Sequence, residues 1–373
     1  MRVNERQVRR IVVKVGTSSL VSERGSLDRE KMANLVDQLA EIKRRGIEVV
    51  LVTSGAIRAG MERLGIQRRP RNIPDQQASA AVGQSLLMNT YTELFTKHNI
   101  IPAQVLLTRD DFRDRVRYLN LRNTMHTLFR FGCLPIVNEN DTVAIEEIRF
   151  EENDTLSALV AASIDADLLL NLSDVEGLYE EDPRKNRKAK LLEEIREITP
   201  EIEALAGATG TDYGRGGMRA KIEAAKIATS SGVTMIIARS TKPHVIIDAV
   251  EGKNVGTRFV GESLGLSHRK RWIAFGNRIK GRIIINEGAK RMLRERGKSL
   301  LAAGIIGCEG SFDVGDLVAI VDEKGEQVGR GFANYSSCEI EQIKGKRSSE
   351  IEKILGHKDF DEVVHRDNLV LGV

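Results

Sequence analysis

Short, almost continuous apolar runs recur through the first 260 residues and alternate with longer stretches of mixed polarity. A run without polar alternation is typical of a strand that is covered on both faces, as in a parallel sheet. Strand and helix that alternate in this way predict an α/β fold, with an open, mainly parallel sheet sandwiched by helices. The predicted strands are 10–15, 48–54, 134–138, 167–174 and 234–240.

Two of the stretches between these runs have clear helical patterns. In 29–45, apolar residues recur every three or four positions, and Gly46 follows as a stop signal. Residues 219–231 are rich in helix-forming residues and are followed by Gly232. Both segments are therefore predicted to be helices that cover the sheet.

The pattern changes after about residue 260, where shorter segments punctuated by glycine replace the long apolar runs. Residues 322–325 separate two alternating runs and predict a hairpin, Gly315-Asp316 predicts another turn, and 287–296 predicts a helix. We expect a first domain over 1–261, a linker over 262–277 and a small β-rich domain over 278–373.

Composition places the chain among ordinary soluble globular proteins. Hydrophobic residues make up 41% of the chain and charged residues 29%, as in soluble globular proteins. Its length of 373 residues is enough for about two domains. A net charge of +4 does not suggest a general polyanion binder. Residues 278–298 carry eight Lys/Arg against two Asp/Glu, so they form either a basic face for nucleic acid or the solvated side of a helix and strand. On charge alone we favour the solvated side.

Cysteine usage and the absence of targeting signals suggest a cytoplasmic protein. Cys133, Cys308 and Cys338 are far apart and lack CxxC spacing, so we expect reduced, mostly buried thiols and no zinc site. The first ten residues lack the apolar core of a signal peptide. No apolar run approaches the roughly 18 residues of a membrane span, so no membrane partner is expected.

The carboxyl ends of the predicted strands carry small or polar residues. In open α/β sheets this edge binds the ligand. Ser, Asn and Asp at such positions also cap helices and form turns, which is the better reading for any single strand end. For all five ends together, a ligand site is the better reading. The ends are 16–18, 53–55, 138–141, 173–174 and 239–240.

Two lysines in glycine-containing turns point to phosphate chemistry. Lys14 lies near the end of the first strand and precedes Gly16, although no GxxxxGK[ST] P-loop occurs. The segment 214–221, GRGGMRAK, opens a predicted helix with Lys221 in its first turns, or is a flexible surface loop. Lysines from opposite ends of the first domain could flank a transferring phosphoryl group.

Three further motifs follow strand ends. VTSGAIRAG (52–60) turns into a helix whose backbone amides could hold a carboxylate or phosphate, or is an ordinary tight turn. NENDTVA (138–144) and ENDTLSA (152–158) repeat Glu-Asn-Asp-Thr, and could bind an ammonium group and orient lysines or form capped turns. SDVEGLYEEDPR (173–184) could cover a nucleotide base, although alone it is a weak signal.

Taken in order, KVGTS, VTSGAI, NENDTVA, NDTLSA, LSDVEGLYEEDPR and GGMRAK resemble the glutamate 5-kinase family of the amino-acid kinase superfamily. INEGAK, GKSLLAAGI, GSFDVGDLV, GRGFANYSS and VVHRDNLVL resemble the PUA domain that many of its members carry. The resemblance spans essentially the whole chain. It implies ATP-dependent phosphorylation of the γ-carboxylate of L-glutamate, the first step of proline biosynthesis.

The resemblance also implies residue roles, carried over by matching motifs. Lys14 and Lys221 would stabilise the phosphoryl group and Asp154 would hold both lysines. Mg²⁺ would bridge ATP oxygens and take few protein ligands, so no metal-binding residue is predicted. Ser54, Asp141 and Asn153 would bind glutamate, with Asp141 suited to its α-ammonium group. The nucleotide-binding residues would be Lys14, Ser173, Asp174, Arg215, Gly216, Gly217, Met218 and Lys221.

The chain departs from the family pattern in the nucleotide loop, where Arg215 replaces the usual threonine, and at Ser173, where threonine is common.

The resemblance also implies a homo-oligomer and feedback inhibition by L-proline. A kinase for another small acid or a nucleoside monophosphate is the same-fold alternative. An RNA-binding or RNA-modification protein is the alternative from another class; nucleic acid is not expected, but the PUA-like domain leaves it open.

Overall fold

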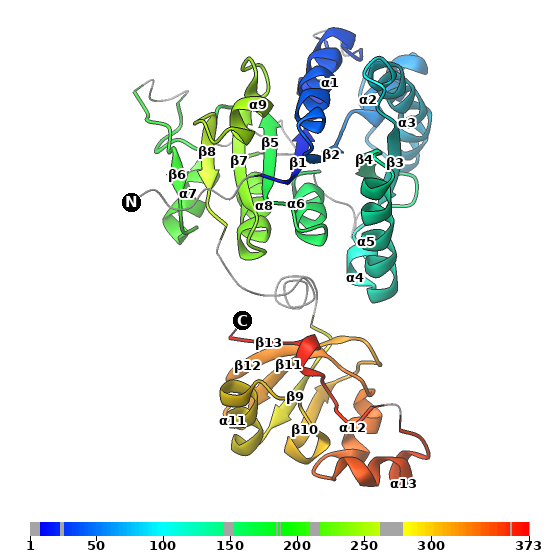
Figure 1. Cartoon of the computed structure of the whole chain (residues 1–373), viewed down its shortest axis with the longest axis vertical. Coiled ribbons are helices and arrows are strands. Elements are labelled where there is room, and N and C mark those ends of the chain that lie inside the picture. The colour runs from blue at the N-terminus through cyan, green and yellow to red at the C-terminus, as the bar shows by residue number, and fades with distance from the viewer. Residues whose placement is uncertain are drawn as a thin grey trace. The chain divides into compact units, whose positions relative to one another are not determined.

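The computed structural model describes residues 8–22, 26–144, 153–183, 186, 188–208, 217–261, 279–358 and 360–372. The chain divides into two compact units, Met1–Leu264 and Gly265–Val373 (Figure 1). The predicted linker, 262–277, lies outside the described residues, so the expected domain limits stay a prediction.

The first unit is built on an eight-stranded sheet with the order β3-β4-β2-β1-β5-β7-β8-β6. Neighbouring strands pair in parallel, except for the antiparallel pair β7 and β8. The strands are β1 (Arg10–Val15), β2 (Glu48–Val52), β3 (Pro102–Leu107), β4 (Leu134–Glu139), β5 (Leu168–Ser173), β6 (Glu194–Ile195), β7 (Thr234–Arg239) and β8 (Gly256–Phe259).

The predicted fold class is confirmed, and each of the five predicted strands is present with ends that differ by at most two residues. The pattern did not reveal β3, β6 and β8. Strand β3 lies at an edge of the sheet, and most of its residues are only partly buried, so it lacks a continuous apolar run. Strands β6 and β8 have only two and four residues, too few for such a run. The sequence therefore predicted the longer strands that are covered on both faces and missed one partly exposed edge strand and two short strands.

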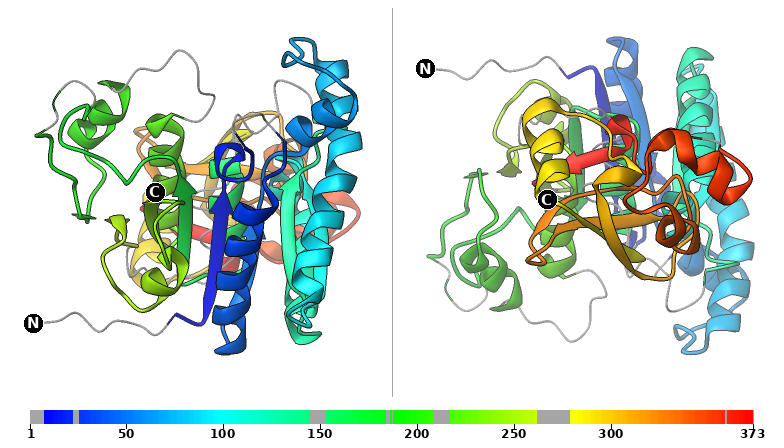
Figure 2. Two further views of the ribbon diagram at one scale, coloured as in Figure 1. Left: turned by 90° about the horizontal axis from the view of Figure 1, so that it is seen from above. Right: turned by 90° about the horizontal axis from the view of Figure 1, so that it is seen from below.

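Helices cover both faces of this sheet. Helices α1 and α9 lie on one face, and α6 and α8 lie on the other (Figure 1). The long helix α3, in cyan, lies at one end of the unit in both views of Figure 2. The helices are α1 (Arg29–Arg44), α2 (Ala56–Arg63), α3 (Ile73–Thr96), α4 (Asp110–Arg113), α5 (Arg115–Arg130), α6 (Asn153–Ser163), α7 (Pro200–Ala208), α8 (Met218–Ser230) and α9 (Val245–Val250).

Both predicted helices are present as α1 and α8. Helix α1 begins where the Asp28 side chain accepts hydrogen bonds from the backbone amides of Glu30 and Lys31. These bonds satisfy two of the amides that a helix start otherwise leaves without a partner. Gly46 follows α1 with a φ of 84°, in the left-handed region that favours glycine.

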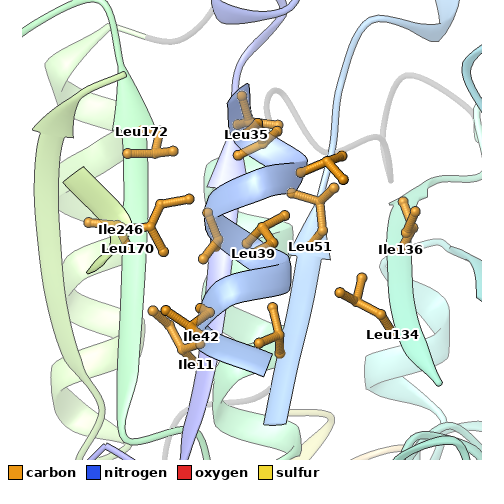
Figure 3. Close-up of a cluster of buried hydrophobic side chains, with 14 of the residues drawn as sticks. Ile11, Leu35, Leu39, Ile42, Leu51, Leu134, Ile136, Leu170, Leu172 and Ile246 are labelled. Atoms are coloured by element: carbon orange, nitrogen blue, oxygen red, sulfur yellow. The ribbon is translucent and has the colours of Figure 1, made fainter. Parts of the chain in front are cut away.

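The main core lies between the sheet and helices α1, α3 and α9. Leu39 and Ile42 of α1 are fully buried over Ile11 of β1 and Leu51 of β2 (Figure 3). Successive residues of a strand point to opposite faces, so Ile11, Val13 and Val15 belong to this core whereas Lys14 points to the α6 and α8 face.

Helices α2 and α3 cross at two glycines without space for a side chain. A Cβ atom on Gly60 would lie 1.7 Å from the carbonyl oxygen of Ser79, and one on Gly83 would lie 1.8 Å from that of Ala56. The close contact fixes α2, whose first residues follow the turn at the end of β2. Gly55 caps this helix with a φ of 102°, which is accessible chiefly to glycine.

The second unit contains a five-stranded sheet with the order β10-β9-β11-β12-β13 and its own buried core. Strands β11 and β12 form the predicted antiparallel hairpin, and α11 covers 287–296 as predicted. The strands and helices are β9 (Gly281–Ile285), α11 (Glu287–Arg296), β10 (Ile305–Gly310), β11 (Leu317–Asp322), β12 (Gln327–Phe332), α12 (Ser337–Ile343), α13 (Ile351–Leu355) and β13 (Leu369–Leu371).

Short 3₁₀ helices complete the described elements: η1 (Thr17–Ser19), η2 (Ala302–Gly304), η3 (Ser348–Glu350) and η4 (Arg366–Asn368). Within the described ranges, no helix combines the length and the apolar character needed to cross a membrane.

Candidate active site

A buried carboxylate holds two lysines together at the carboxyl edge of the large sheet. The Asp154 carboxylate lies 2.5 Å from Lys14 Nζ through Oδ1 and 3.2 Å from Lys221 Nζ through Oδ2. Asp154 is fully buried, and each lysine is only 5% exposed. Residues separated by more than 200 positions thus form one charged cluster.

Three elements place this cluster. Lys14 is the penultimate residue of β1, Asp154 is in the first turn of α6, and Lys221 is in the first turn of α8. The positive end of the helix dipole favours a carboxylate in the first turn of α6 and disfavours a lysine in the first turn of α8. The carboxylate of Asp154 offsets that unfavourable position of Lys221.

The cluster has a net charge of +1, from two ammonium groups and one carboxylate. Removal of such groups from water is unfavourable unless the charges are paired and hydrogen-bonded. The net positive charge of these three groups would favour an anionic ligand beside them. A phosphoryl group matches this requirement, because ammonium groups stabilise charge on its oxygens.

Asn171 also contacts Asp154, and the sequence pattern did not reveal it. Its side-chain amide donates a 2.7 Å hydrogen bond to the same Oδ1 atom that Lys14 contacts. Asn171 is fully buried in β5. The signal was present in the sequence, where this residue is the one polar side chain between Leu168 and Leu172.

A second polar network joins the ends of β2 and β4 to the start of α6. The Asn153 side-chain amide lies 2.5 Å from the Thr53 carbonyl oxygen, 3.0 Å from Ser54 Oγ and 2.9 Å from Asn138 Oδ1. Asn138 in turn donates to Gln84 of α3. The network places the predicted glutamate-binding residues Ser54 and Asn153 in direct contact.

Thr53 is also tied to the core. Its hydroxyl lies 2.9 Å from the hydroxyl of the fully buried Tyr91 on α3. Burial raises the pKa of Tyr91 above its usual range, so the phenol stays protonated at neutral pH. This hydrogen bond connects the carboxyl end of β2 with the apolar layer beneath it.

The remaining predicted residues lie at the same edge. Asp141 is half-buried in the turn after β4. After β5, the buried Ser173 donates a 3.0 Å hydrogen bond to the exposed Asp174. Gly217 caps α8 and Met218 is its first residue. The structure does not describe Arg215 and Gly216, so their predicted contact with nucleotide stays a prediction.

The order of the strands arranges these groups in space. Strands β4, β2, β1, β5 and β7 are consecutive and parallel, so their carboxyl ends share one edge. The predicted glutamate-binding residues follow β2 and β4, and Ser173 ends β5 with Asp174 next to it. Lys14 lies on β1, between the two sides. The lysine cluster is thus positioned between a candidate acceptor side and a candidate nucleotide side.

Metal ligands and thiols do not form a site in the described parts of the chain. Among those residues, no group of three or more His, Cys, Asp or Glu side chains is placed to hold a metal ion. The three cysteines are free, as expected, but the expectation of burial was wrong. Cys338 on α12 is exposed, while Cys133 and Cys308 are half-buried. Burial raises the pKa of the Cys308 thiol to about 11.

Known proteins match both units. The amino acid kinase family matches residues 9–239, and the PUA domain matches residues 281–355. The glutamate 5-kinase of Thermoanaerobacter sp. (strain X514) is 50% identical over 362 residues, which cover 97% of each chain. That of Carboxydothermus hydrogenoformans is 49% identical over 372 residues, which cover 100% of each chain.

A solved structure supports the fold of the first unit. The carbamate kinase from Giardia lamblia, bound to AMP-PNP, aligns with a TM-score of 0.50 and 19% identity, covering 68% of this chain and 99% of that one. Full-length identity near 50% supplies the closer assignment. The chain belongs to the amino acid kinase family, among the glutamate 5-kinases, and carries a C-terminal PUA domain.

Proposed function

We propose that this chain transfers the γ-phosphoryl group of ATP to the γ-carboxylate of L-glutamate, giving L-glutamyl 5-phosphate and ADP. This reaction is the first step of proline biosynthesis. The observation that carries the proposal is the Lys14–Asp154–Lys221 cluster, in a chain that is 50% identical over its length to a glutamate 5-kinase.

The chemistry requires positioning and charge stabilisation more than proton transfer. A side-chain carboxylate with a pKa of ~4.3 is already ionised at pH 7, so the nucleophile needs no general base. One carboxylate oxygen attacks the γ-phosphorus, and the bond to the β-phosphate oxygen breaks, leaving ADP with the electron pair. The main barriers are the repulsion between two anions and their alignment.

Lys14 and Lys221 address the repulsion. Asp154 holds both ammonium groups, so they are ordered before the phosphoryl group arrives and can stabilise the charge on its oxygens. Lysines contact both carboxylate oxygens of Asp154, and the ionised acceptor has no proton for a general base to remove. We therefore assign Lys14 and Lys221 as the catalytic groups and Asp154 as the residue that holds them.

L-Glutamate would bind on the β2 and β4 side of Lys14. Ser54 and Asn153 lie in one hydrogen-bond network there, and their hydroxyl and amide groups suit a carboxylate or amide-like ligand. Asp141, in the turn after β4, supplies a negative charge for the α-ammonium group of the amino acid. This pairing would favour a free amino acid over an N-acylated one.

ATP would bind on the β5 and β7 side, near Ser173, Asp174 and the start of α8. The N-terminal amides of α8 and the glycine-rich segment before it suit phosphates, with Arg215 a further candidate contact. The donors present fit a triphosphate, and Mg²⁺ brought with ATP would be held mainly by phosphate oxygens. The metal would supply further neutralisation of the phosphate charge.

The test is acyl-phosphate formation trapped by hydroxylamine, with ATP and L-glutamate, D-glutamate, L-aspartate or N-acetyl-L-glutamate. We expect turnover with L-glutamate, and loss of turnover in Lys14→Ala. Lys97→Ala, which removes an exposed lysine after α3, is the matched control and should be active. Turnover that prefers another acid, or an active Lys14→Ala enzyme, would contradict the proposal.

The family relationship motivates two further proposals, a homo-oligomer and feedback inhibition by L-proline. Sedimentation at several protein concentrations tests the first, and the hydroxylamine assay with added L-proline tests the second.

An RNA role for the PUA domain stays the alternative. In α11, Arg291 and Arg294 are exposed, which fits a solvated helix face as well as a binding face. Arg291→Ala with Arg294→Ala should leave RNA retention on a filter unchanged if the face is only solvated.

A further inference from the structure

Asn171 lies in a row that crosses the sheet beside the lysine cluster. In the strand register it is paired with Lys14 of β1 on one side and Ile237 of β7 on the other. Paired residues of neighbouring parallel strands lie on the same face of a sheet. Lys14 and Asn171 therefore project together toward α6 and α8, where Asp154 and Lys221 lie.

The hydrogen bond to Asp154 determines which way the Asn171 amide faces. A carboxylate only accepts hydrogen bonds, so the nitrogen of the amide must face Asp154 and the oxygen must face away. Asp154 Oδ1 then receives Asn171 Nδ2 at 2.7 Å and Lys14 Nζ at 2.5 Å. The amide thus restricts rotation of the carboxylate that positions both lysines.

The oxygen atom of the Asn171 amide lowers the stability of the fold. Asn171 Oδ1 is buried and has no hydrogen-bond partner among the described residues. A buried acceptor without a partner is destabilising, so an apolar side chain of similar shape would suit this strand on stability grounds. The neighbouring positions Leu170 and Leu172 carry such side chains.

From these contacts we infer that Asn171 is a positioning residue for phosphoryl transfer: it fixes the Asp154 carboxylate with a neutral donor and so preserves the net positive charge of the lysine cluster. Asn171→Asp keeps the shape of the side chain but adds a negative charge that cancels the net positive charge of the cluster. Asn171→Leu keeps the net positive charge but lacks the hydrogen-bond donor. The inference rests on the proposed function for the transfer step, whereas its charge component depends only on nucleotide binding.

The test compares Asn171→Leu and Asn171→Asp with the wild type, using steady-state kinetics with L-glutamate, calorimetric binding of a non-hydrolysable ATP analogue with Mg²⁺, and thermal unfolding. For Asn171→Leu we expect kcat to fall about 10- to 100-fold, as for a small displacement of catalytic groups. Both KM values should stay within about threefold, and the unfolding midpoint should not fall.

For Asn171→Asp we expect a similar or larger loss of kcat. Its dissociation constant for the ATP analogue should rise about tenfold or more, because the cluster becomes neutral. Gln38→Leu is the control: Gln38 is a buried amide on the opposite face of the sheet that accepts from the backbone amide of Ile246 at 3.1 Å. It should unfold at a lower temperature but have a wild-type kcat.

The inference is overturned if Asn171→Leu has a kcat within threefold of wild type, or if both Asn171 variants bind the ATP analogue equally well. A fall in midpoint for Asn171→Leu that matches that of Gln38→Leu would assign Asn171 a structural role. A wild-type protein that phosphorylates none of the acids would refute the proposed function instead, and the binding comparison would still decide the charge component.

Discussion

Strand β1 separates two regions of the first unit with opposite character. On one face, Ile11, Val13 and Val15 pack against the apolar side chains of α1 and α9. On the other face, Lys14 enters a buried cluster of charges with Asp154 and Lys221. Val13 and Lys14 are adjacent in sequence but lie in different environments, because successive residues of a strand point to opposite faces.

The comparison shows how this fold combines stability with reactivity. Apolar burial on the α1 face stabilises the sheet in proportion to the area removed from water. The buried ion pairs on the α6 face stabilise less, because desolvation of the charges offsets much of their attraction. The first region thus supports the strands, and the second region places charges where an apolar core would be more stable.

The largest effect is expected from a substitution that disrupts the charged region. Asp154→Ala removes the carboxylate and leaves two buried ammonium groups without it, so we expect a loss of about 3–5 kcal/mol in the free energy of unfolding. Acyl-phosphate formation should fall at least ~100-fold. Denaturant unfolding and the hydroxylamine assay measure the two effects, and wild-type stability in this variant would contradict the description of the cluster.

The matching change in the apolar region is Leu39→Ala in α1. Leu39 is fully buried in the main core, and its truncation should lower the free energy of unfolding by about 2–5 kcal/mol. Since the residue lies on the opposite face from Lys14, kcat of the folded enzyme should stay within about threefold. A selective loss of kcat below the unfolding transition would show that the two faces are coupled.

A smaller effect is expected where the two regions meet. Tyr91→Phe keeps the buried ring on α3 but removes the hydroxyl that lies 2.9 Å from Thr53 Oγ1. We expect a loss of about 0.5–1.5 kcal/mol in the free energy of unfolding. Any increase in KM should concern L-glutamate rather than ATP, because Thr53 precedes Ser54. Chemical unfolding and KM for both substrates test this, and a change in KM for ATP alone would contradict it.

The smallest effect concerns an exposed ion pair, as a contrast with Lys14 and Asp154. Arg45, after α1, lies 2.9 Å from Glu251, after α9. Arg45→Ala should change the denaturation midpoint only slightly, and less in high salt, because solvent screens the pair. A midpoint change as large as that of Asp154→Ala would contradict the difference between buried and exposed pairs.

The Arg45–Glu251 pair also predicts how the stability of the protein changes with pH. Hydrogen bonds from Lys253 and then Arg45 lower the pKa of Glu251. A carboxylate with a lowered folded-state pKa stabilises the protein above its unfolded pKa of ~4.3, and this contribution is lost as pH falls through the folded value. The small advantage of wild type over Arg45→Ala should therefore be present at pH 7 and vanish in acid, as thermal unfolding at both pH values would show.

Much of the architecture followed from the sequence alone. Strands covered on both faces have continuous apolar runs, so β1, β2, β4, β5 and β7 could be located from local composition. Edge strand β3 could not, because partial exposure gives it a mixed pattern. The ordered motifs also indicate the family and point to Lys14, Asp154 and Lys221 as site residues, although motifs alone do not show that these residues are in contact.

Only the tertiary structure decided how these residues act together. Sequence periodicity assigns a residue to a face of its own strand or helix but contains no information on which distant residue meets it. The contact of Asp154 with two lysines, the order of β4, β2, β1 and β5, and the part played by Asn171 depend on strand pairing and helix packing across the chain. These are long-range contacts, and the chain makes them only when the sheet is assembled.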